Sequence, residues 1–272
     1  MAKGVGMTRA IAFVNQKGGV TKTTSVANTG AALAELGHRV LVVDADPQAN
    51  LTESFGAEEA LGTKLEDALV ARDRRRPAKV LAGATPATPN GIPGGVDLLP
   101  CTAELADVAT ELPKRAGYEL RLRELIDALR EGYDYILIDT PPGLGILSGM
   151  ALLAADAVIV PCRPADLDVG GAAKVYDLVE EAVREFNPDL EVLGVLVAQT
   201  QRRWVLRRDT HQSVAEQGMA VLPVEIPFSV RVGAAPRYGA PTFVLEPDGR
   251  VAQAYRALAE HLETSLTAKA AA

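Results

Sequence analysis

The chain has 272 residues, of which 48% are hydrophobic and 23% are charged, a balance typical of a globular protein with a full core. The formal net charge of −7 excludes a protein whose whole surface binds nucleic acid, so any such contact must be a local patch. Two cysteines, Cys101 and Cys162, are too few for a disulfide framework or a four-cysteine zinc site, and we expect both to be core thiols.

Short apolar runs alternate along the chain with longer segments of helical composition. The first run, residues 10–15, precedes a helical pattern over 22–36 that stops at Gly37, a residue typical of helix ends. Further strands are predicted at 39–44, 96–99, 135–139, 157–161, 192–198 and 221–226. Further helices are predicted at 118–130, 170–186, 205–217 and 251–266. Apolar strands separated by helices favour a doubly wound, mostly parallel α/β sheet with helices on both faces.

We expect a single domain over residues 1–272, with an ordered core of about 8–266. Residues 72–95 combine a charge run with a stretch rich in Pro, Gly and Thr, and are interpreted as a solvated surface loop. The start of the chain lacks the apolar region of a signal peptide, and no run of about 18 uninterrupted apolar residues occurs. These features predict a cytoplasmic protein.

The segment 15–24, with sequence NQKGGVTKTT, lies between the first strand and the first helix. This is the setting of a phosphate-binding loop, in which backbone N–H groups and the helix dipole point at one anion. Lys22 would reach the β- and γ-phosphates of a nucleotide, and the Thr23 hydroxyl would bind Mg²⁺. Gln16 and Thr21 stand where the usual motif has glycine, and Thr21 is unfavourable if the loop needs a positive φ there.

Carboxylates follow two further strands. Asp44 and Asp46 occur in the sequence DADPQ at the end of the second strand, and Asp139 occurs in IDTPP at the end of a later one. Ligands of doubly wound sheets bind beyond the carboxyl ends of the strands. The carboxylates can therefore hold waters around Mg²⁺ and orient an attacking water.

Together these three motifs resemble the deviant Walker A, switch I and Walker B/switch II motifs of the ParA/MinD ATPases, and most of all the small Soj-like ParA partition proteins. The similarity runs from about residue 8 to about residue 262. It implies a P-loop NTPase fold and a slow, Mg²⁺-dependent hydrolysis of ATP. The resemblance also implies catalytic roles for Lys17, Lys22 and Asp46, of which Lys17 reaches the partner subunit's nucleotide in a sandwich dimer. It implies nucleotide binding by Lys17, Gly18, Gly19, Val20, Thr21, Lys22, Thr23 and Thr24, and a magnesium site at Thr23, Asp44 and Asp139.

Two arginine-containing segments form a candidate DNA interface, and the first lies near the start of a predicted helix. Four of them lie within residues 202–208, and a segment over 230–241 resembles the ParA stretch that carries a DNA-contacting arginine. Guanidinium groups suit sequence-independent phosphate contacts. The candidates are Arg202, Arg203 and Arg231, helped by Arg207 and Arg208, and the alternative is a solvated helix face.

The resemblance predicts a DNA-partition ATPase, associated with the nucleoid, that dimerises with ATP, binds double-stranded DNA without sequence preference and is released by a ParB-like partner. Residues 258–272 hold one lysine and two glutamates, which disfavours a membrane-binding tail. Two alternatives stay open: a ParA-like ATPase that positions a cargo other than DNA, and a metabolic P-loop enzyme.

Overall fold

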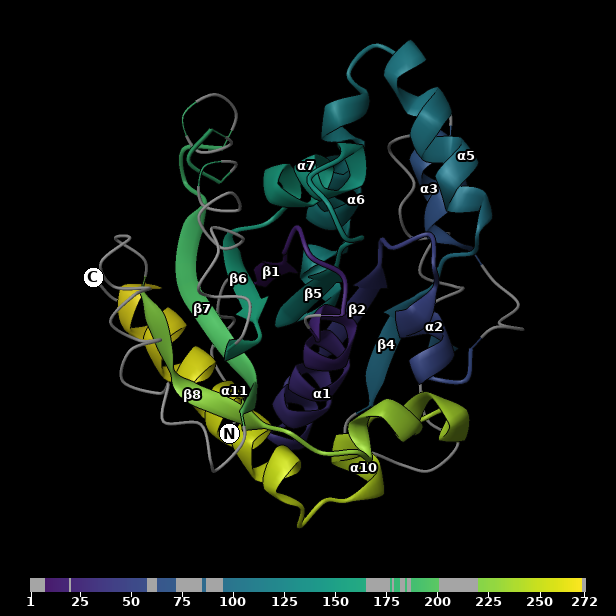
Figure 1. Cartoon of the computed structure of the whole chain (residues 1–272). Helices are drawn as coiled ribbons and strands as arrows, with labels where there is room; N and C mark the ends of the chain where they lie inside the picture. Colours follow the sequence, from purple (N-terminus) through teal and green to yellow (C-terminus); the bar gives the residue numbers. More distant parts are fainter. Residues whose placement is uncertain are drawn as a thin grey trace.

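The computed structural model of the chain describes residues 8–19, 21–57, 63–71, 85–86, 95–164, 177, 179–181, 184, 187–200 and 220–270. Eight strands among these residues form one sheet in the spatial order β3-β4-β2-β5-β1-β6-β7-β8 (Figure 1). In chain order they are β1 (Arg9–Phe13), β2 (Val40–Asp44), β3 (Thr85–Pro86), β4 (Val96–Leu99), β5 (Tyr135–Asp139), β6 (Ala157–Cys162), β7 (Glu191–Thr200) and β8 (Val221–Pro227).

The sheet is parallel except at one edge, where β3 runs antiparallel to β4. This confirms the predicted fold class, and each of the seven predicted strands is present. The first strand is shorter than predicted, because pairing ends at Phe13. The two-residue strand β3 lies inside the segment 72–95, for which the sequence predicts a surface loop, and most of that segment lies outside the described residues.

The longest of the described helices agree with the sequence-based prediction only in part. The predicted helices 22–36 and 251–266 are confirmed, whereas 118–130 begins as a 3₁₀ turn and becomes α-helical at Arg121. The predicted helices 170–186 and 205–217 fall wholly or mostly outside the described residues. The α-helices are α1 (Lys22–Glu35), α2 (Asn50–Ser54), α3 (Leu65–Val70), α5 (Glu104–Glu111), α6 (Arg121–Leu129), α7 (Ile146–Ala154), α10 (Thr242–Leu245) and α11 (Arg250–Ala270).

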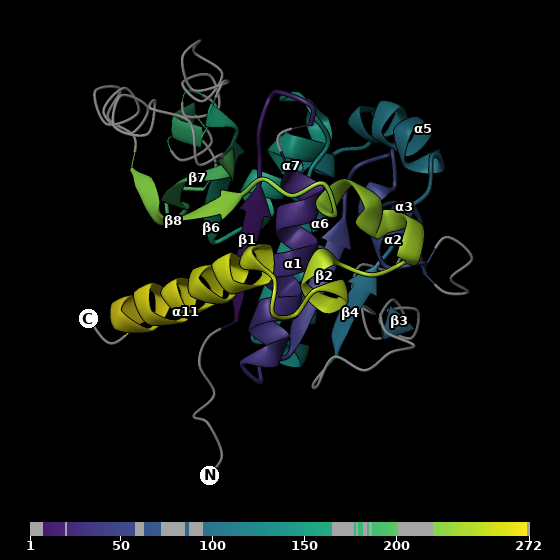
Figure 2. The ribbon, with the colours of Figure 1, turned by 60° about the horizontal axis from the view of Figure 1, so that its bottom comes forward.

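Alternating side chains of the buried strands point to two separate cores. On β2, Leu41 and Val43 pack with α6 and α7, whereas Val40 and Val42 pack with α1 and α11. Figure 2 views the molecule from the side of α1 and α11. Gly30 lets α1 approach closely, because a Cβ at this position would lie 3.0 Å from the side chain of Val42. Burial of both sheet faces explains why these strands are apolar throughout.

The carboxyl ends of β1, β2 and β5 meet at one edge of the sheet. In the register of the strands, Asp139 on β5 lies beside Asp44 on β2 and beside Phe13 on β1. The residues that follow these strands therefore come together, as the sequence predicted. Among the described residues, no helix is both long and apolar enough to cross a membrane.

Candidate functional site

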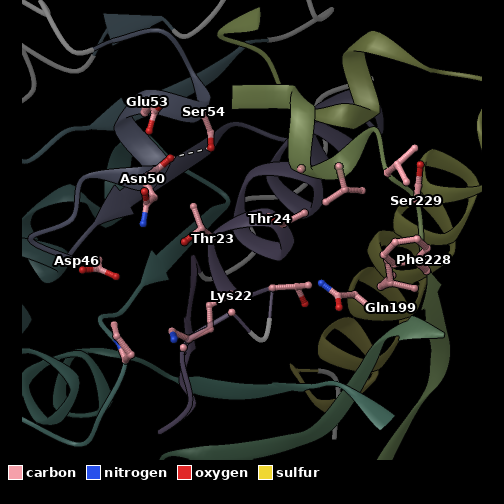
Figure 3. A pocket seen from close by; sticks show the side chains of 18 of the residues that line it. Lys22, Thr23, Thr24, Asp46, Asn50, Glu53, Ser54, Gln199, Phe228 and Ser229 are labelled. Atoms are coloured by element: carbon pink, nitrogen blue, oxygen red, sulfur yellow. Dashed lines mark hydrogen bonds between the residues drawn. The ribbon is translucent and has the colours of Figure 1, made fainter. Parts of the chain in front are cut away.

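A cleft of about 610 Å³ opens at the carboxyl end of the sheet (Figure 3). Most of its walls come from the loop after β1 with the start of α1, the turn before α2 with α2 itself, the end of β7, and the end of β8 with the residues that follow it; Pro142 after β5 and Tyr255 on α11 complete the lining. The volume is typical of a site for a small molecule or cofactor. Ligands of doubly wound sheets bind at this end of the strands.

The loop between β1 and α1 turns the amino end of α1 toward this cleft. Gly19 and Thr21 have φ values of 70° and 71°, and the Thr21 carbonyl accepts the backbone N–H of Ser25 at 2.8 Å. In the described structure no side chain caps α1, and its first turn holds no acidic residue. Uncapped N–H groups and the positive end of the helix dipole favour an anion such as a phosphate.

Asn15 fixes the start of the same loop. Its Oδ1 accepts the backbone N–H of Lys17 at 3.0 Å, and its Nδ2 donates to the Pro161 carbonyl at 2.7 Å and to Cys162 Sγ at 3.2 Å. The loop is thereby tied to the end of β6. On its other side, the Gly143 N–H donates to the Gln16 carbonyl at 2.9 Å, which joins the loop to the segment after β5.

Lys22 is the buried cation of the site. It begins α1, its side chain extends into the cleft (Figure 3), and it is only 6% exposed. Its Nζ donates to the Lys17 carbonyl at 3.4 Å. Burial lowers the pKa of Lys22, and the charges of Asp139 and Asp46 oppose that shift. A lysine held in this way can neutralise the charge of an anion at the amino end of α1.

Asp44 ends β2 and Asp46 lies in the turn that follows it, and both are buried. Burial raises the pKa of Asp44 to about 6. The hydrogen bonds donated by Thr52 and by the Asp46 backbone act in the opposite direction and lower this pKa. Burial also raises the pKa of Asp46, whereas the positive charge of Lys22 lowers it. Asp46 lines the cleft together with the start of α1, whereas Asp44 does not line it.

Asp139 is the most unusual carboxylate of the site. It is fully buried, and neither of its oxygens has a hydrogen-bond partner among the described residues. Burial raises the pKa of Asp139 well above its ordinary value, as does the charge of Asp44, whereas the Thr23 hydroxyl and the Lys22 charge lower it. A buried carboxylate without partners carries a large free-energy cost, so this position calls for a cation or ordered water.

The site fits a magnesium ion that keeps most of its water. Among the described residues, no group of three or more His, Cys, Asp or Glu is arranged to bind a metal directly. Mg²⁺ needs few protein ligands when waters and substrate phosphates complete its shell. The unpartnered oxygens of Asp139 and the nearby Thr23 hydroxyl are donors of the right chemistry for such a shell.

Strained backbone also gathers at this cleft. Among the described residues, the non-glycine residues with positive φ are Thr21, Ala49 and Gln199. Thr21 and Gln199 line the cleft, and Ala49 precedes α2, whose first residue lines it. Strained conformations persist where the surrounding structure over-determines them, and they cluster at functional sites.

The candidate DNA-binding arginines are only partly described. Arg202, Arg203, Arg207 and Arg208 lie outside the described residues, as does Val20 of the phosphate loop. Arg231 follows β8, is exposed, and forms an ion pair with Glu246 at 2.8 Å. Its neighbours Val230 and Val232 line the cleft, so Arg231 lies at the rim of the same site.

Several residues of the site did not emerge from the sequence. Thr52 donates two hydrogen bonds to Asp44. Gln199 near the end of β7 and the half-exposed ring of Phe228 after β8 line the cleft. A polar or aromatic residue directly after a predicted strand is the only signal that could have pointed to Gln199 and Phe228. The two cysteines are buried and form no disulfide with each other, as predicted.

Comparison with known proteins identifies the family. A family model described as an AAA domain matches residues 8–192. The chain is 37% identical to the chromosome partitioning protein ParA of Caulobacter vibrioides over 97% of this chain and 98% of that protein. The chain belongs to the ParA/Soj family of partition ATPases. The sporulation initiation inhibitor protein Soj of Bacillus subtilis is a further relative, 35% identical over 94% of this chain and 98% of Soj.

A solved structure supports the same fold for this ParA/Soj chain. It is that of a protein named cobyrinic acid a,c-diamide synthase, from Mycobacterium smegmatis, with bound ATP analog and magnesium. It has a TM-score of 0.79 and 34% identity, and the match covers 94% of each chain. Family membership confirms the predicted ATPase activity.

Thr21 gives this ParA/Soj chain a strained phosphate loop, which leads to a first prediction. Thr21→Gly should raise the free energy of unfolding by about 1 kcal/mol, because a β-branched residue at positive φ is strained by more than the added chain entropy of glycine. Urea unfolding measures this change. Thr21→Ala, which keeps Cβ but loses the branch, should gain less. A glycine variant no more stable than the parent chain would show that the loop accommodates threonine without strain.

Proposed function

We propose that the cleft binds ATP with Mg²⁺ and that the chain is a DNA-partition ATPase. The observation that carries the proposal is the convergence of the buried cation Lys22 with the carboxylates of Asp46 and Asp139 at the uncapped amino end of α1. The nucleotide-binding residues are Lys17, Gly18, Gly19, Val20, Thr21, Lys22, Thr23 and Thr24. The metal site comprises Thr23 and Asp139, with Asp44 buried beside them.

The residues of the site have separate roles in phosphoryl transfer, whose catalysis depends mostly on positioning and charge neutralisation. Backbone N–H groups of the loop and the Lys22 ammonium hold the phosphates. Asp46, which lines the cleft, orients the attacking water and accepts its proton. Bound Mg²⁺ supplies charge neutralisation between the β- and γ-phosphates.

We propose further that ATP binding assembles a sandwich dimer. Lys17 directly precedes Gly18 and Gly19, which line the cleft. In the dimer it contacts the partner subunit's nucleotide. Supplying this lysine from a second copy couples hydrolysis to dimerisation. The dimer binds double-stranded DNA without sequence preference and dissociates when a ParB-like partner stimulates hydrolysis. The protein is then cytoplasmic and associated with the nucleoid.

The proposal is tested by nucleotide-dependent assembly and DNA binding. With a slowly hydrolysed ATP analogue, light scattering should show a dimer, and a gel shift on random-sequence duplex should appear at low salt and weaken as salt rises. Lys17→Ala should stay monomeric, whereas Asp46→Ala should accumulate the dimer with ATP because water positioning is lost. The same mass for all three proteins with and without ATP would contradict the dimer, and a dimer that never shifts DNA would contradict the partition role.

One observation favours a second candidate, a metabolic P-loop enzyme. The similar solved structure described above is named as a cobyrinic acid a,c-diamide synthase. Such an enzyme would consume ATP only with its small-molecule substrate present. We prefer the partition role because curated relatives from Caulobacter vibrioides and Thermus thermophilus, which match 97% and 93% of this chain, are named as chromosome-partitioning proteins. Stimulation of ATP hydrolysis by cobyrinic acid and not by DNA with a ParB-like protein would reverse this preference.

A further inference from the structure

The two neighbouring carboxylates Asp44 and Asp139 differ sharply in their hydrogen bonding. Asp44 Oδ2 accepts both the backbone N–H of Thr52 at 2.8 Å and its Oγ1 hydroxyl at 2.7 Å, and Asp44 Oδ1 accepts the backbone N–H of Asp46 at 3.2 Å. Neither oxygen of Asp139 has a partner among the described residues. Both carboxylates are completely buried and lie side by side in the strand register. Their environments therefore suit different roles.

The hydrogen bonds of Asp44 connect Thr52 on α2 to the turn that carries Asp46. The backbone N–H of Asp46 donates a hydrogen bond to Asp44. The carbonyl of Asp46 accepts a second hydrogen bond, from the Cys101 thiol, at 3.0 Å. The Cys101 backbone N–H in turn donates to Thr52 Oγ1 at 3.3 Å. Thr52 on α2 and Cys101 after β4 thus hold the Asp46 turn from two sides, in a network that is buried throughout.

A carboxylate has about four acceptor positions, and three of those on Asp44 are already used by the protein. Little capacity remains for waters of a metal shell. Asp139 accepts no hydrogen bond of normal geometry from the described residues, and the Thr23 hydroxyl at the start of α1 is the side chain close enough to lower its pKa by hydrogen bonding. The sequence placed both carboxylates in the magnesium shell, whereas the hydrogen bonds separate them.

We propose that Thr52 is a positioning residue for ATP hydrolysis: through Asp44 it fixes the turn that orients Asp46, while Asp139 keeps the place in the metal site already proposed for it. The proposal rests on the proposed hydrolysis of ATP at this site and is independent of DNA binding. A group that acts by positioning should affect the rate of the chemical step more than the binding of nucleotide or metal.

Thr52→Val keeps the shape of the side chain and removes its hydroxyl. The kcat for ATP hydrolysis should fall about tenfold or more, because one hydrogen bond to a buried carboxylate is lost and Asp46 is misplaced. The KM for ATP should change by less than about twofold, since the phosphate loop is untouched. Thr52→Ser restores the hydroxyl and should restore most of kcat. Thr242→Val is the matched control, because the Thr242 hydroxyl is equally buried and has no partner among the described residues.

The metal dependence of binding separates the two carboxylates without relying on turnover. Mg²⁺ is titrated while calorimetry follows binding of a non-hydrolysable ATP analogue. Asp139→Asn should raise the Mg²⁺ concentration required by about tenfold or more, as removal of an outer-shell partner does, whereas Thr52→Val should leave it as in the parent chain. The Mg²⁺ titration shows which carboxylate contributes to the metal site even if the parent chain hydrolyses no ATP. Absence of ATP hydrolysis in the parent chain would contradict the proposed function itself.

Three results would overturn the positioning role: an unchanged kcat in Thr52→Val, a raised Mg²⁺ requirement in Thr52→Val, or failure of Thr52→Ser to recover activity. If Thr52→Val does not fold, Cys101→Ala gives a second test, because it removes the thiol that donates to the Asp46 carbonyl and leaves Thr52 in place. It should lower kcat with no change in the Mg²⁺ requirement, and an unchanged kcat would again contradict the proposal.

Discussion

Lys22→Ala is expected to abolish measurable ATP binding, with a loss of affinity of about a hundredfold or more, as for removal of one partner of a buried charge pair. The side chain is almost fully buried at the amino end of α1, where the phosphates are proposed to lie. Without it, the charges that remain nearest to the phosphates are the carboxylates Asp46 and Asp139. Calorimetry with a slowly hydrolysed ATP analogue and Mg²⁺ measures the loss.

The control for this variant is a lysine remote from the cleft. Lys114→Ala removes an exposed lysine that pairs with Glu111 in the segment after α5, and ATP affinity should be unchanged. Circular dichroism establishes that Lys22→Ala is folded. An affinity within about threefold of the parent chain would place the phosphates elsewhere, because so small a change corresponds to less than 1 kcal/mol.

The sequence was sufficient to predict the parallel strands of the sheet, but not all of the helices around it or the short edge strand β3. Runs such as 135–139 are apolar on both faces, which only a strand covered on both sides explains. Helix α7 was missed because its sequence, ILSGMALLA, is apolar on nearly every side and contains a glycine, so it shows no helical periodicity. The two-residue strand β3 depends on pairing with β4 and leaves no periodic pattern of its own.

The candidate site was predictable where it depends on chain position alone. Asp44 and Asp139 end adjacent parallel strands, so topology is enough to bring them together. The sequence raised a positive φ at Thr21 as a condition, since the usual motif has glycine there, and the structure gives this residue a φ of 71°. The contacts of Thr52 and Cys101 could not be predicted, since they depend on α2 folding back over the end of β2 and on β4 lying beside it.

Arg231 is the described arginine on which the proposed DNA binding depends. Its guanidinium forms an ion pair with Glu246, and its side chain remains 69% exposed. Ion pairs this exposed are weak and are screened by salt, so a DNA phosphate can compete with Glu246 for the arginine. Each dimer would present two copies of Arg231, and the salt dependence of DNA binding grows with the number of phosphate contacts.

Arg231→Glu should therefore eliminate the gel shift of random-sequence duplex at low salt, while ATP binding and dimerisation survive. The milder Arg231→Ala should reduce the slope of log affinity against log salt by about 2, because a dimer loses two phosphate contacts of about 0.9 each. Glu246→Gln releases the arginine and should tighten DNA binding slightly. Arg123→Glu is the matched control, since Arg123 is exposed on α6, which packs on the opposite face of the sheet. If Arg231→Glu shifts DNA as the parent chain does, the DNA interface lies elsewhere, and the arginines at 202–208 become the next positions to reverse.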